Sequence, residues 1–388
     1  MGTKTKLSSK VYFLLWFLTA CATPKLLLTS NARGPASTSD DWKVLKRQSY
    51  FTNETAENPG PWTRSLSFSA DGERIALRGL QEGRVYDIHS NKTYQMPGDD
   101  DDFPSGGSGL INLVGDSSKI LALGDDKFAI WKFSERAFQV IDTTNLAQAY
   151  LSKTFGSVPH HPTTSEAVLS RDGTVLLSMQ TETLQNNSII GWKLPEMFPI
   201  GAVLQNKGVE SFQSAAIDSS GDTVFIGDAK LTKYSLARKQ FIGSVVSDSQ
   251  SRTAQIPDQV LSAVSADGHT CLIAAYGFQA DSSKRRIDVY DVQSSKLIMQ
   301  FDFPDKGMQW SVSKSMSVTA DCSLLLVGGF DRAKLMSIQM GKELAEFSEP
   351  LSIVPGEADQ HQLSAVAISN NGKRIALGYR QVVIFERN

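Results

Sequence analysis

Residues 65–96 read SLSFSADGERIALRGLQEGRVYDIHSNKTYQM, and this stretch predicts one sheet of four short strands. Apolar and polar residues alternate around Leu66 and Phe68, around Ile75 and Leu77, along residues 85–88 and weakly along residues 94–96. That alternation is the period of a half-buried strand. Asp71-Gly72 tolerates the positive φ of a tight turn between the first two strands, and the polar residues 89–92 supply a second turn before the fourth strand.

The same unit recurs along the whole chain. Its first turn aligns with six others, at intervals of 45 to 56 residues, and an apolar residue stands three positions before each turn. The seven turns are Asp71-Gly72, Asp116-Ser117, Asp172-Gly173, Ser220-Gly221, Asp267-Gly268, Asp321-Cys322 and Asn371-Gly372. A four-stranded repeat of this length buries its sheet faces only against neighbouring copies. The sequence therefore predicts an all-β, seven-bladed β-propeller of four-stranded antiparallel blades.

The seventh repeat lacks a fourth strand. It offers strands at 363–369, 374–378 and 382–386, and the sequence then stops at Asn388. Residues 41–47 (DWKVLKR) alternate partially and have no blade of their own. We expect this segment to pair beside residues 382–386 as the outer strand of blade seven, because that pairing closes the ring and removes exposed sheet edges.

The predicted third strands carry a family resemblance. Five of them contain Tyr86-Asp87, Trp131-Lys132, Trp192-Lys193, Tyr234-Ser235 and Tyr290-Asp291, whereas blade six departs at Ser337 and the last has Phe385-Glu386. This position resembles the Trp-Asp strand of WD40 repeats, with the aromatic place kept and Asp kept only at Asp87 and Asp291. The Gly-His pair of that family is not found at the expected places. From residue 41 to the C-terminus the chain thus resembles a diverged WD40-like or YVTN-type propeller, and we interpret its aromatic residues as packing residues.

The N-terminus predicts a membrane-directed signal. Lys4, Lys6 and Lys10 precede the apolar run of residues 11–20, which is too short to span a bilayer as a helix. The run ends in Leu18-Thr19-Ala20-Cys21, which resembles the bacterial lipobox. That resemblance implies removal of residues 1–20 and acylation of Cys21, and Ala22 at the next position implies the outer membrane. The alternative is a conventional signal cut after Ala20-Cys21-Ala22, which would release the protein.

Three segments follow from these observations. Residues 1–20 form the predicted lipoprotein signal peptide, and residues 41–388 form the predicted propeller. Residues 21–40 between them are rich in Thr, Ser, Pro, Ala and Gly without a sustained period, as in a flexible tether.

Composition sets broad limits on function. The chain has 388 residues, of which 41% are hydrophobic and 21% charged, and its net charge is −2. This is ordinary for a globular protein with a large core, and it lacks the strongly basic balance expected of a nucleic-acid partner. The sequence also has no G-x-S-x-G elbow, H-E-x-x-H, phosphate-binding glycine loop or C-x-x-C pair. We expect no nucleic acid, no cofactor and no catalytic residue.

The longest insertions fall between blades, at 97–109, 142–164, 247–259, 304–314 and 349–362, and shorter ones join second to third strands at 181–188 and 278–285. In a blade that runs outward from the axis, both kinds of connection emerge on one face, and repeat proteins tend to bind there. The candidate binding face comprises Asp99, Asp100, Asp101, Asp102, Phe103, His160, His161, Phe278, Lys284, Arg285, Trp310 and His361.

Three charged or histidine-containing segments near this face could have a more specific binding role. The carboxylates of residues 99–102 could bind calcium, but they lack the spacing of an EF-hand loop, so a solvated acidic loop is favoured. His160-His161 has no Cys or spaced His nearby, and we expect no metal site. Lys284-Arg285-Arg286 could meet an anionic partner, and solvated charge beside a third strand is the favoured alternative.

Cys271 and Cys322 are the remaining thiols. They fall near the same end of blades five and six, but their aligned positions differ by three residues. We expect buried free thiols, with a disulfide as the alternative.

The sequence as a whole predicts a membrane-anchored cell-envelope lipoprotein whose propeller is a non-enzymatic scaffold for a protein or peptide. The alternative is an envelope enzyme, or a carbohydrate- or ion-binding protein, with its site at the axial mouth of the propeller. Some propeller lipoproteins assist assembly of outer-membrane proteins, which offers an analogy for the scaffold.

Overall fold

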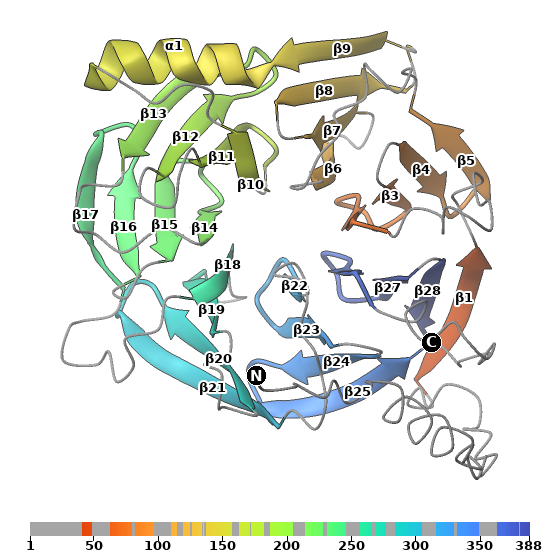
Figure 1. Ribbon diagram of the computed structural model, residues 1–388. Helices are drawn as coiled ribbons and strands as arrows, with labels where there is room; N and C mark the ends of the chain where they lie inside the picture. Colours follow the sequence, from red (N-terminus) through yellow and green to blue (C-terminus); the bar gives the residue numbers. More distant parts are fainter. Residues whose placement is uncertain are drawn as a thin grey trace, which may run out of the picture. The chain divides into compact units, whose positions relative to one another are not determined.

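A computed structural model of the protein shows seven four-stranded antiparallel sheets arranged as the blades of a ring (Figure 1). Contacts divide the chain into Met1–Pro35 and Ala36–Asn388, and every residue described below belongs to the second unit. The structure describes residues 41–48, 63–79, 82–96, 110–114, 119–124, 126–133, 135, 137–156, 163–170, 172–181, 187–204, 214–227, 231–245, 257–264, 268–276, 284–304, 316–329, 332–348, 363–379 and 381–388.

The strands of each blade follow one another outward from the axis. Blade one consists of β2 (Ser65–Phe68), β3 (Arg74–Arg78), β4 (Gly83–Asp87) and β5 (Lys92–Gln95). Blade two consists of β6 (Leu110–Val114), β7 (Lys119–Leu123), β8 (Lys127–Lys132) and β9 (Ala137–Asp142). Blade three consists of β10 (Thr163–Leu169), β11 (Val175–Thr181), β12 (Asn187–Lys193) and β13 (Phe198–Leu204). Blade four consists of β14 (Ser214–Ile217), β15 (Thr223–Gly227), β16 (Thr232–Ser235) and β17 (Gln240–Ser244).

The remaining three blades complete the ring. Blade five consists of β18 (Pro257–Val264), β19 (Thr270–Tyr276), β20 (Lys284–Asp291) and β21 (Lys296–Pro304). Blade six consists of β22 (Met316–Val318), β23 (Leu324–Gly328), β24 (Arg332–Ser337) and β25 (Lys342–Ser348). Blade seven consists of β26 (Ala365–Ile368), β27 (Arg374–Gly378), β28 (Val382–Arg387) and, as its outer strand, β1 (Trp42–Gln48).

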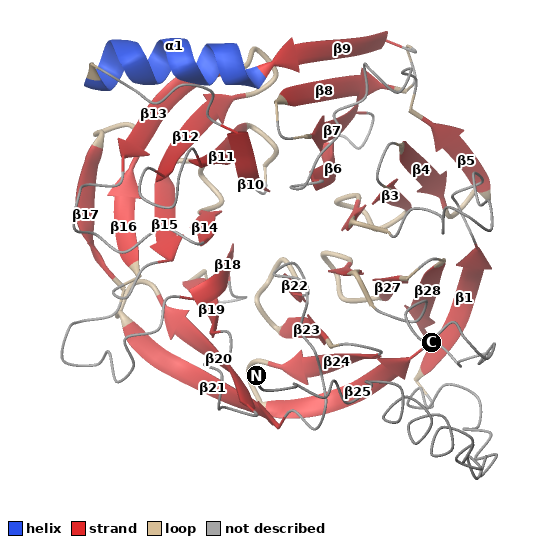
Figure 2. Cartoon of the chain, viewed as in Figure 1, coloured by secondary structure: helices blue, strands red, loops and turns tan. Residues whose placement is uncertain are grey.

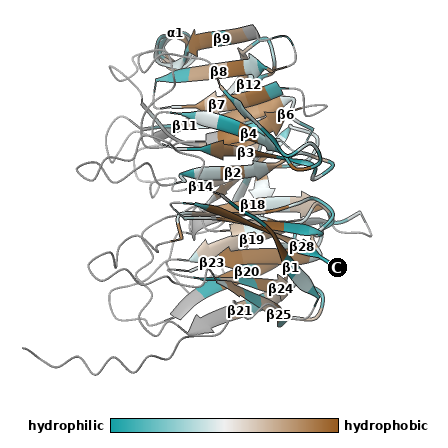
Figure 3. Ribbon diagram, turned by 90° about the vertical axis from the view of Figure 1, so that its right-hand side faces the viewer, coloured by the Kyte–Doolittle hydropathy of each residue, from teal (hydrophilic) through white to brown (hydrophobic). Residues whose placement is uncertain are grey.

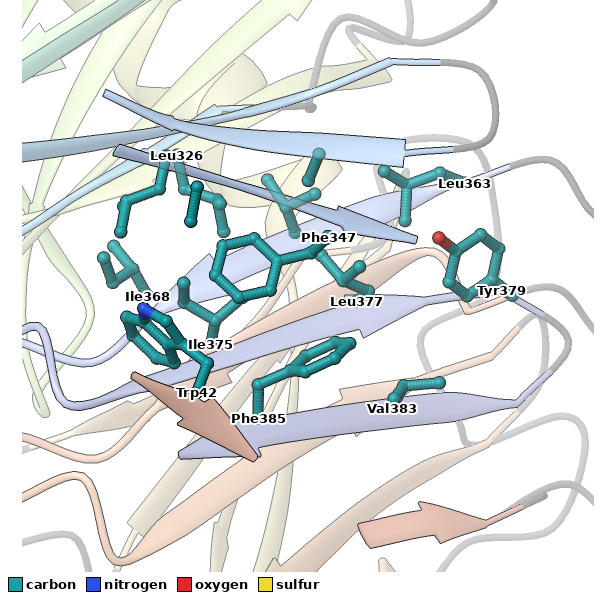
Figure 4. Packing of buried hydrophobic residues seen from close by; sticks show 14 residues of the cluster. Trp42, Leu326, Phe347, Leu363, Ile368, Ile375, Leu377, Tyr379, Val383 and Phe385 are labelled. Carbon is teal, nitrogen blue, oxygen red and sulfur yellow. The ribbon is translucent and has the colours of Figure 1, made fainter. Parts of the chain in front are cut away.

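The predicted closure of the ring is confirmed. β1 pairs antiparallel with β28, from Trp42 opposite Arg387 to Gln48 opposite Val382. The backbone N–H of Asn388 also donates to the carbonyl of Asp41 at 2.8 Å, so the first and last described residues are tied together. Trp42 is buried, and its ring meets Phe347 of blade six edge-on at 5.1 Å between centroids (Figure 4). The closing strand therefore joins two blades as well as the two ends.

One hydrogen-bonded turn recurs between first and second strands. Gly72, Gly173, Gly221, Gly268 and Gly372 have positive φ, as the sequence predicts, and Cys322 takes the same conformation in blade six at φ 60°. In blades one, three and six, an Asp side chain accepts from a hydroxyl two residues earlier and from a backbone N–H two residues later. The turn of residues 116–117 lies outside the described residues.

The hydrogen bonds of these turns also stabilise the charged form of their Asp carboxylates. Burial alone would raise the pKa of Asp71, Asp172 and Asp321, but the hydroxyl and N–H donors of the turn outweigh it and hold each pKa below its ordinary value. The hydroxyl of Ser170 lies 2.6 Å from Asp172 and itself accepts from the N–H of Val175 at 2.8 Å. Each turn thereby fixes the start of its second strand.

The core is divided among the interfaces between blades. The described buried apolar residues form seven clusters, one at each junction of neighbouring blades. Figure 3 shows apolar residues along strands such as β3 and β20 from different blades. Because a four-stranded sheet cannot bury both faces alone, this distribution makes every blade depend on its two neighbours.

The inter-blade segment 142–164 contains a helix that the sequence pattern did not predict. α1 (Thr143–Phe155) begins after Asp142, whose side chain accepts from the N–H of Asn145 at 3.0 Å, and it ends at Gly156 (Figure 2). Ala147 and Leu151 point one helical turn apart into the cluster between blades two and three. The helix therefore covers the edge of that interface.

Candidate functional site

The strand order gives the propeller two different rims. We call the rim where first strands turn into second, and third into fourth, the turn rim. We call the opposite rim the connection rim. There, second strands end, third strands begin and fourth strands leave the blade. The strand ends that flank the predicted long insertions all lie on the connection rim, as the sequence predicts from the order of the strands. The long segments themselves lie largely outside the described residues.

An axial cavity of about 340 Å³ lies among the innermost strands. Its described walls come from first strands such as β2, β10 and β26 and combine apolar residues with hydroxyls and amides. Its polar wall residues include Ser67, Asn112, Ser317 and Asn370, and Arg64 is the single charged residue among those that the structure describes there. A second cavity of about 190 Å³ shares part of this wall, including Leu169, Leu261 and Asn370.

A buried polar cluster lies between blades four and five, near the connection rim. A carboxylate oxygen of Asp288, a side chain that is almost fully buried, lies 2.8 Å from the guanidinium of Arg286 and accepts from the hydroxyl of Tyr290 at 3.0 Å. The Arg286 guanidinium lies over the ring of Tyr276 at 4.5 Å. Burial raises the pKa of Tyr276 and Tyr290, so both hydroxyls stay protonated at neutral pH and neither supplies a phenolate base.

This cluster changes one expectation from the sequence. The solvated charge expected at residues 284–286 is wrong for Arg286, because its head group is held between Asp288 and an aromatic ring. All three basic residues also belong to β20 itself. The overlooked signal is the alternation of Arg286, Asp288 and Tyr290 with Ile287 and Val289, which places the polar side chains on one face of the strand.

A second network connects three strands of blade three. Trp192 on β12 donates its ring N–H to the hydroxyl of Ser178 on β11 at 2.7 Å. The amide of Gln180 donates to the same hydroxyl at 2.9 Å and to the hydroxyl of Thr164 on β10 at 3.0 Å. All three polar side chains are buried. Gln180 therefore links the hydroxyl groups of β10 and β11, and Trp192 joins β12 to the same network.

Cys271 and Cys322 form a disulfide, and the expectation of free thiols is wrong. Cys271 lies in β19 of blade five and Cys322 in the first turn of blade six, with 6.6 Å between their Cα atoms. The two residues occupy different positions in their repeats. They still meet, because the first turn of blade six lies beside the second strand of blade five. The bond fastens two blades near the turn rim.

Most of the candidate binding residues lie outside the described residues. They are the run Asp99, Asp100, Asp101, Asp102 and Phe103, the pair His160 and His161, and Phe278, Trp310 and His361; the predicted lipidation site, Cys21, also lies outside them. Lys284 and Arg285 are placed by their backbones only, where β20 begins at the connection rim opposite Pro304 and Phe303 of β21.

The described part of the chain brings together no group of three or more His, Cys, Asp or Glu side chains that could hold a metal ion. Within that part, α1 is neither long nor apolar enough to serve as a membrane-spanning helix. The fold thus defines the class of protein, a seven-bladed β-propeller. The chain matches no protein-family model and no curated protein.

Proposed function

We propose that the protein is a cell-envelope lipoprotein, tethered to a membrane through Cys21, whose propeller is a non-enzymatic binding platform for a protein or peptide. The observation that carries the binding role is the asymmetry of the two rims. The turn rim is made of short, internally hydrogen-bonded turns, whereas the strand ends that flank every long insertion between strands lie on the connection rim. Rigid blades that present variable connections on one side are the usual plan of a recognition surface.

The envelope location has separate support. Disulfides persist in oxidising compartments, and the bond between Cys271 and Cys322 fits a chain that folds after export. The sequence around Cys21 supplies the basic, apolar and small-residue order of an acylated signal. By the resemblance to the lipobox, we place the anchor in the outer membrane of a double-membraned bacterium.

Acylation of Cys21 is directly testable. Cells that express the full chain and grow with an alkyne-tagged palmitate are expected to label the wild-type protein and to lose the label entirely in Cys21→Ala. C271A/C322G is the matched control, because both sulfur atoms lie in the disulfide of the propeller and their loss should leave the label unchanged. A released, unlabelled wild-type protein would instead support the conventional signal cut after Ala22.

The binding role calls for crosslinking in the protein's own cells. A photoreactive residue at Gln95 or Ser348, where fourth strands end at the connection rim, is expected to capture a discrete protein partner. The same probe at Ser90 or Gln339, in turns of the opposite rim, is the matched control and should capture none. Equal capture from both rims, or none from the connection rim, would contradict the platform.

The axial cavity supports a second candidate function. A volume of about 340 Å³ is at the small end of ligand sites, and its hydroxyl and amide walls suit a carbohydrate or an ion. No partner from crosslinking, together with turnover or binding of a small molecule by the purified protein, would favour an envelope enzyme or small-ligand binder with its site at the axial mouth.

We also propose a distant relationship to WD40-like or YVTN-type propellers. The support is the aromatic place kept in the third strands and the hydrogen bond from Trp192 to Ser178, which reproduces part of the buried network of that family. Blade six departs from this pattern with Met336, and other blades keep the aromatic residue with different partners. In blade one, for example, the hydroxyl of Tyr86 donates to Asn91 at 2.8 Å.

A further inference from the structure

Exposed apolar side chains gather where the outer strands of blades four, five and six begin. They are Phe241 and Ile242 on β17, Leu297 and Ile298 on β21, and Met340 in the turn before β25, and they are 41% to 57% exposed. Exposed basic residues stand beside them, namely Arg238, Lys239, Lys296 and Lys342. We call these nine residues the rim arc.

The rim arc has no carboxylate of its own, and carboxylates in the same blades are occupied elsewhere. Asp222 accepts from the N–H of Ala237 at 2.8 Å, and Asp291 accepts from the N–H of Ser294 at 3.0 Å. Glu343 pairs with Lys334 at 2.8 Å. The surface therefore combines aromatic and aliphatic side chains with positive charge, as in protein segments that lie in the interface of an anionic membrane.

The outer strands that carry the rim arc contact one another. Ser295, in the turn before β21, donates to the carbonyl of Ser244 at the end of β17 at 3.5 Å. Gly341, in the turn before β25, lies so close to Met299 of β21 that an added Cβ would stand 2.7 Å from its sulfur. The starts of β21 and β25 thus lie beside the outer strand of the preceding blade (Figure 1).

The chain enters the propeller on the same side. Trp42 lies opposite Arg387, where β28 ends, and that end of blade seven belongs to the turn rim. Blade seven follows blade six, the last blade of the rim arc. The segment between Cys21 and Asp41 reaches ~70 Å at most when fully extended, which is long enough to let the turn rim meet the bilayer that the proposed lipid enters.

We propose that the rim arc is a peripheral contact with an anionic lipid membrane. The orientation that it gives the propeller rests on the proposed acylation of Cys21, whereas the lipid contact itself does not. A second copy of the chain fits this surface less well, because a two-fold contact of the rim arc with itself would place Arg238, Lys239 and Lys296 opposite like charges. Membrane contact uses both features, since the apolar groups enter the interface and the cations face lipid phosphates.

The test uses residues 21–388 with Cys21→Ser, so that no acyl chain contributes. This protein is expected to bind vesicles of phosphatidylglycerol and phosphatidylethanolamine in a sedimentation assay, and to bind phosphatidylcholine vesicles at least about tenfold more weakly. The variant F241S/I242S/L297S/I298S is expected to lose about tenfold or more of the binding to anionic vesicles. Added salt should weaken the wild-type binding.

Two further variants separate the contributions. K239E/K296E is expected to lose the preference for anionic lipid, whereas V140S/L146S, which changes exposed apolar residues on blade two and α1, should bind as the wild type does. Equal binding by the wild type to both kinds of vesicle, or unchanged binding by the four-serine variant, would overturn the proposal. A wild type that sediments as a dimer, becomes monomeric in that variant and binds no vesicles would overturn it as well. Palmitate labelling of Cys21 tests the anchor independently.

Discussion

Deletion of residues 41–50 is expected to lower the free energy of unfolding by several kcal/mol and to shift the melting curve sharply downward. The deletion removes the outer strand of blade seven, uncovers the pairing edge of β28 and takes Trp42 out of the cluster between blades six and seven. An uncovered edge also invites pairing with other chains, so we expect the truncated protein to aggregate on heating. Thermal unfolding followed by circular dichroism measures the effect.

A single substitution separates side-chain packing from strand pairing. Trp42→Ala keeps the backbone of β1 and is expected to cost about 3–5 kcal/mol, because the lost ring leaves a cavity beside Phe347 and Phe385. Val44→Ala, in the same strand and exposed, is the control and should change stability by less than about 0.5 kcal/mol. A melting curve that the deletion leaves unchanged would refute the closure of the ring.

Loss of the Cys271–Cys322 bond is the second large effect. The two residues are 51 positions apart, and constraint of a loop of that length in the unfolded chain is worth about 4 kcal/mol in the chain-entropy model. C271A/C322G is the preferred variant, since glycine accepts the positive φ that Cys322 adopts. Chemical denaturation with and without a reductant measures the loss.

The reductant supplies the internal control for that experiment. It is expected to destabilise the wild type by an amount close to the effect of the double variant, and to leave the variant unchanged because no bond remains to be reduced. If the wild type were equally stable with and without reductant, the bond would contribute nothing to the stability of the ring.

The repeat was predictable because its strongest constraints are local. A turn that needs positive φ selects Gly at Gly72, Gly173 and Gly372, and the apolar residue three positions earlier marks the strand that enters the turn. The closure of the ring was predictable from the number of strands in each repeat. The seventh repeat lacks one strand, so a ring of four-stranded blades needs another strand from elsewhere in the chain. Residues 42–47 were the unassigned segment with strand alternation.

Three features of the structure were not predictable in the same way. Asp142 caps the N-terminus of α1, but its place in the sequence indicates only a connection between two strands. The disulfide was missed because alignment compares positions within a repeat, whereas the bond joins unequal positions of adjacent repeats. The cluster around Asp288 was missed for a related reason, since Tyr276 on another strand completes it.

The pairing of β1 with β28 also sets the order in which the molecule can be completed. β1 is synthesised before any blade, yet its partner β28 is the last of the described strands, 334 positions later by the register of Gln48 and Val382. Until residues 382–387 arrive, the edge that β1 covers does not exist, and the cluster around Trp42 lacks Val383 and Phe385. A chain that ends before residue 382 would leave the backbone hydrogen-bonding groups of β1 without their partner strand. We expect proteases to cleave such an unfinished molecule at this exposed N-terminal strand.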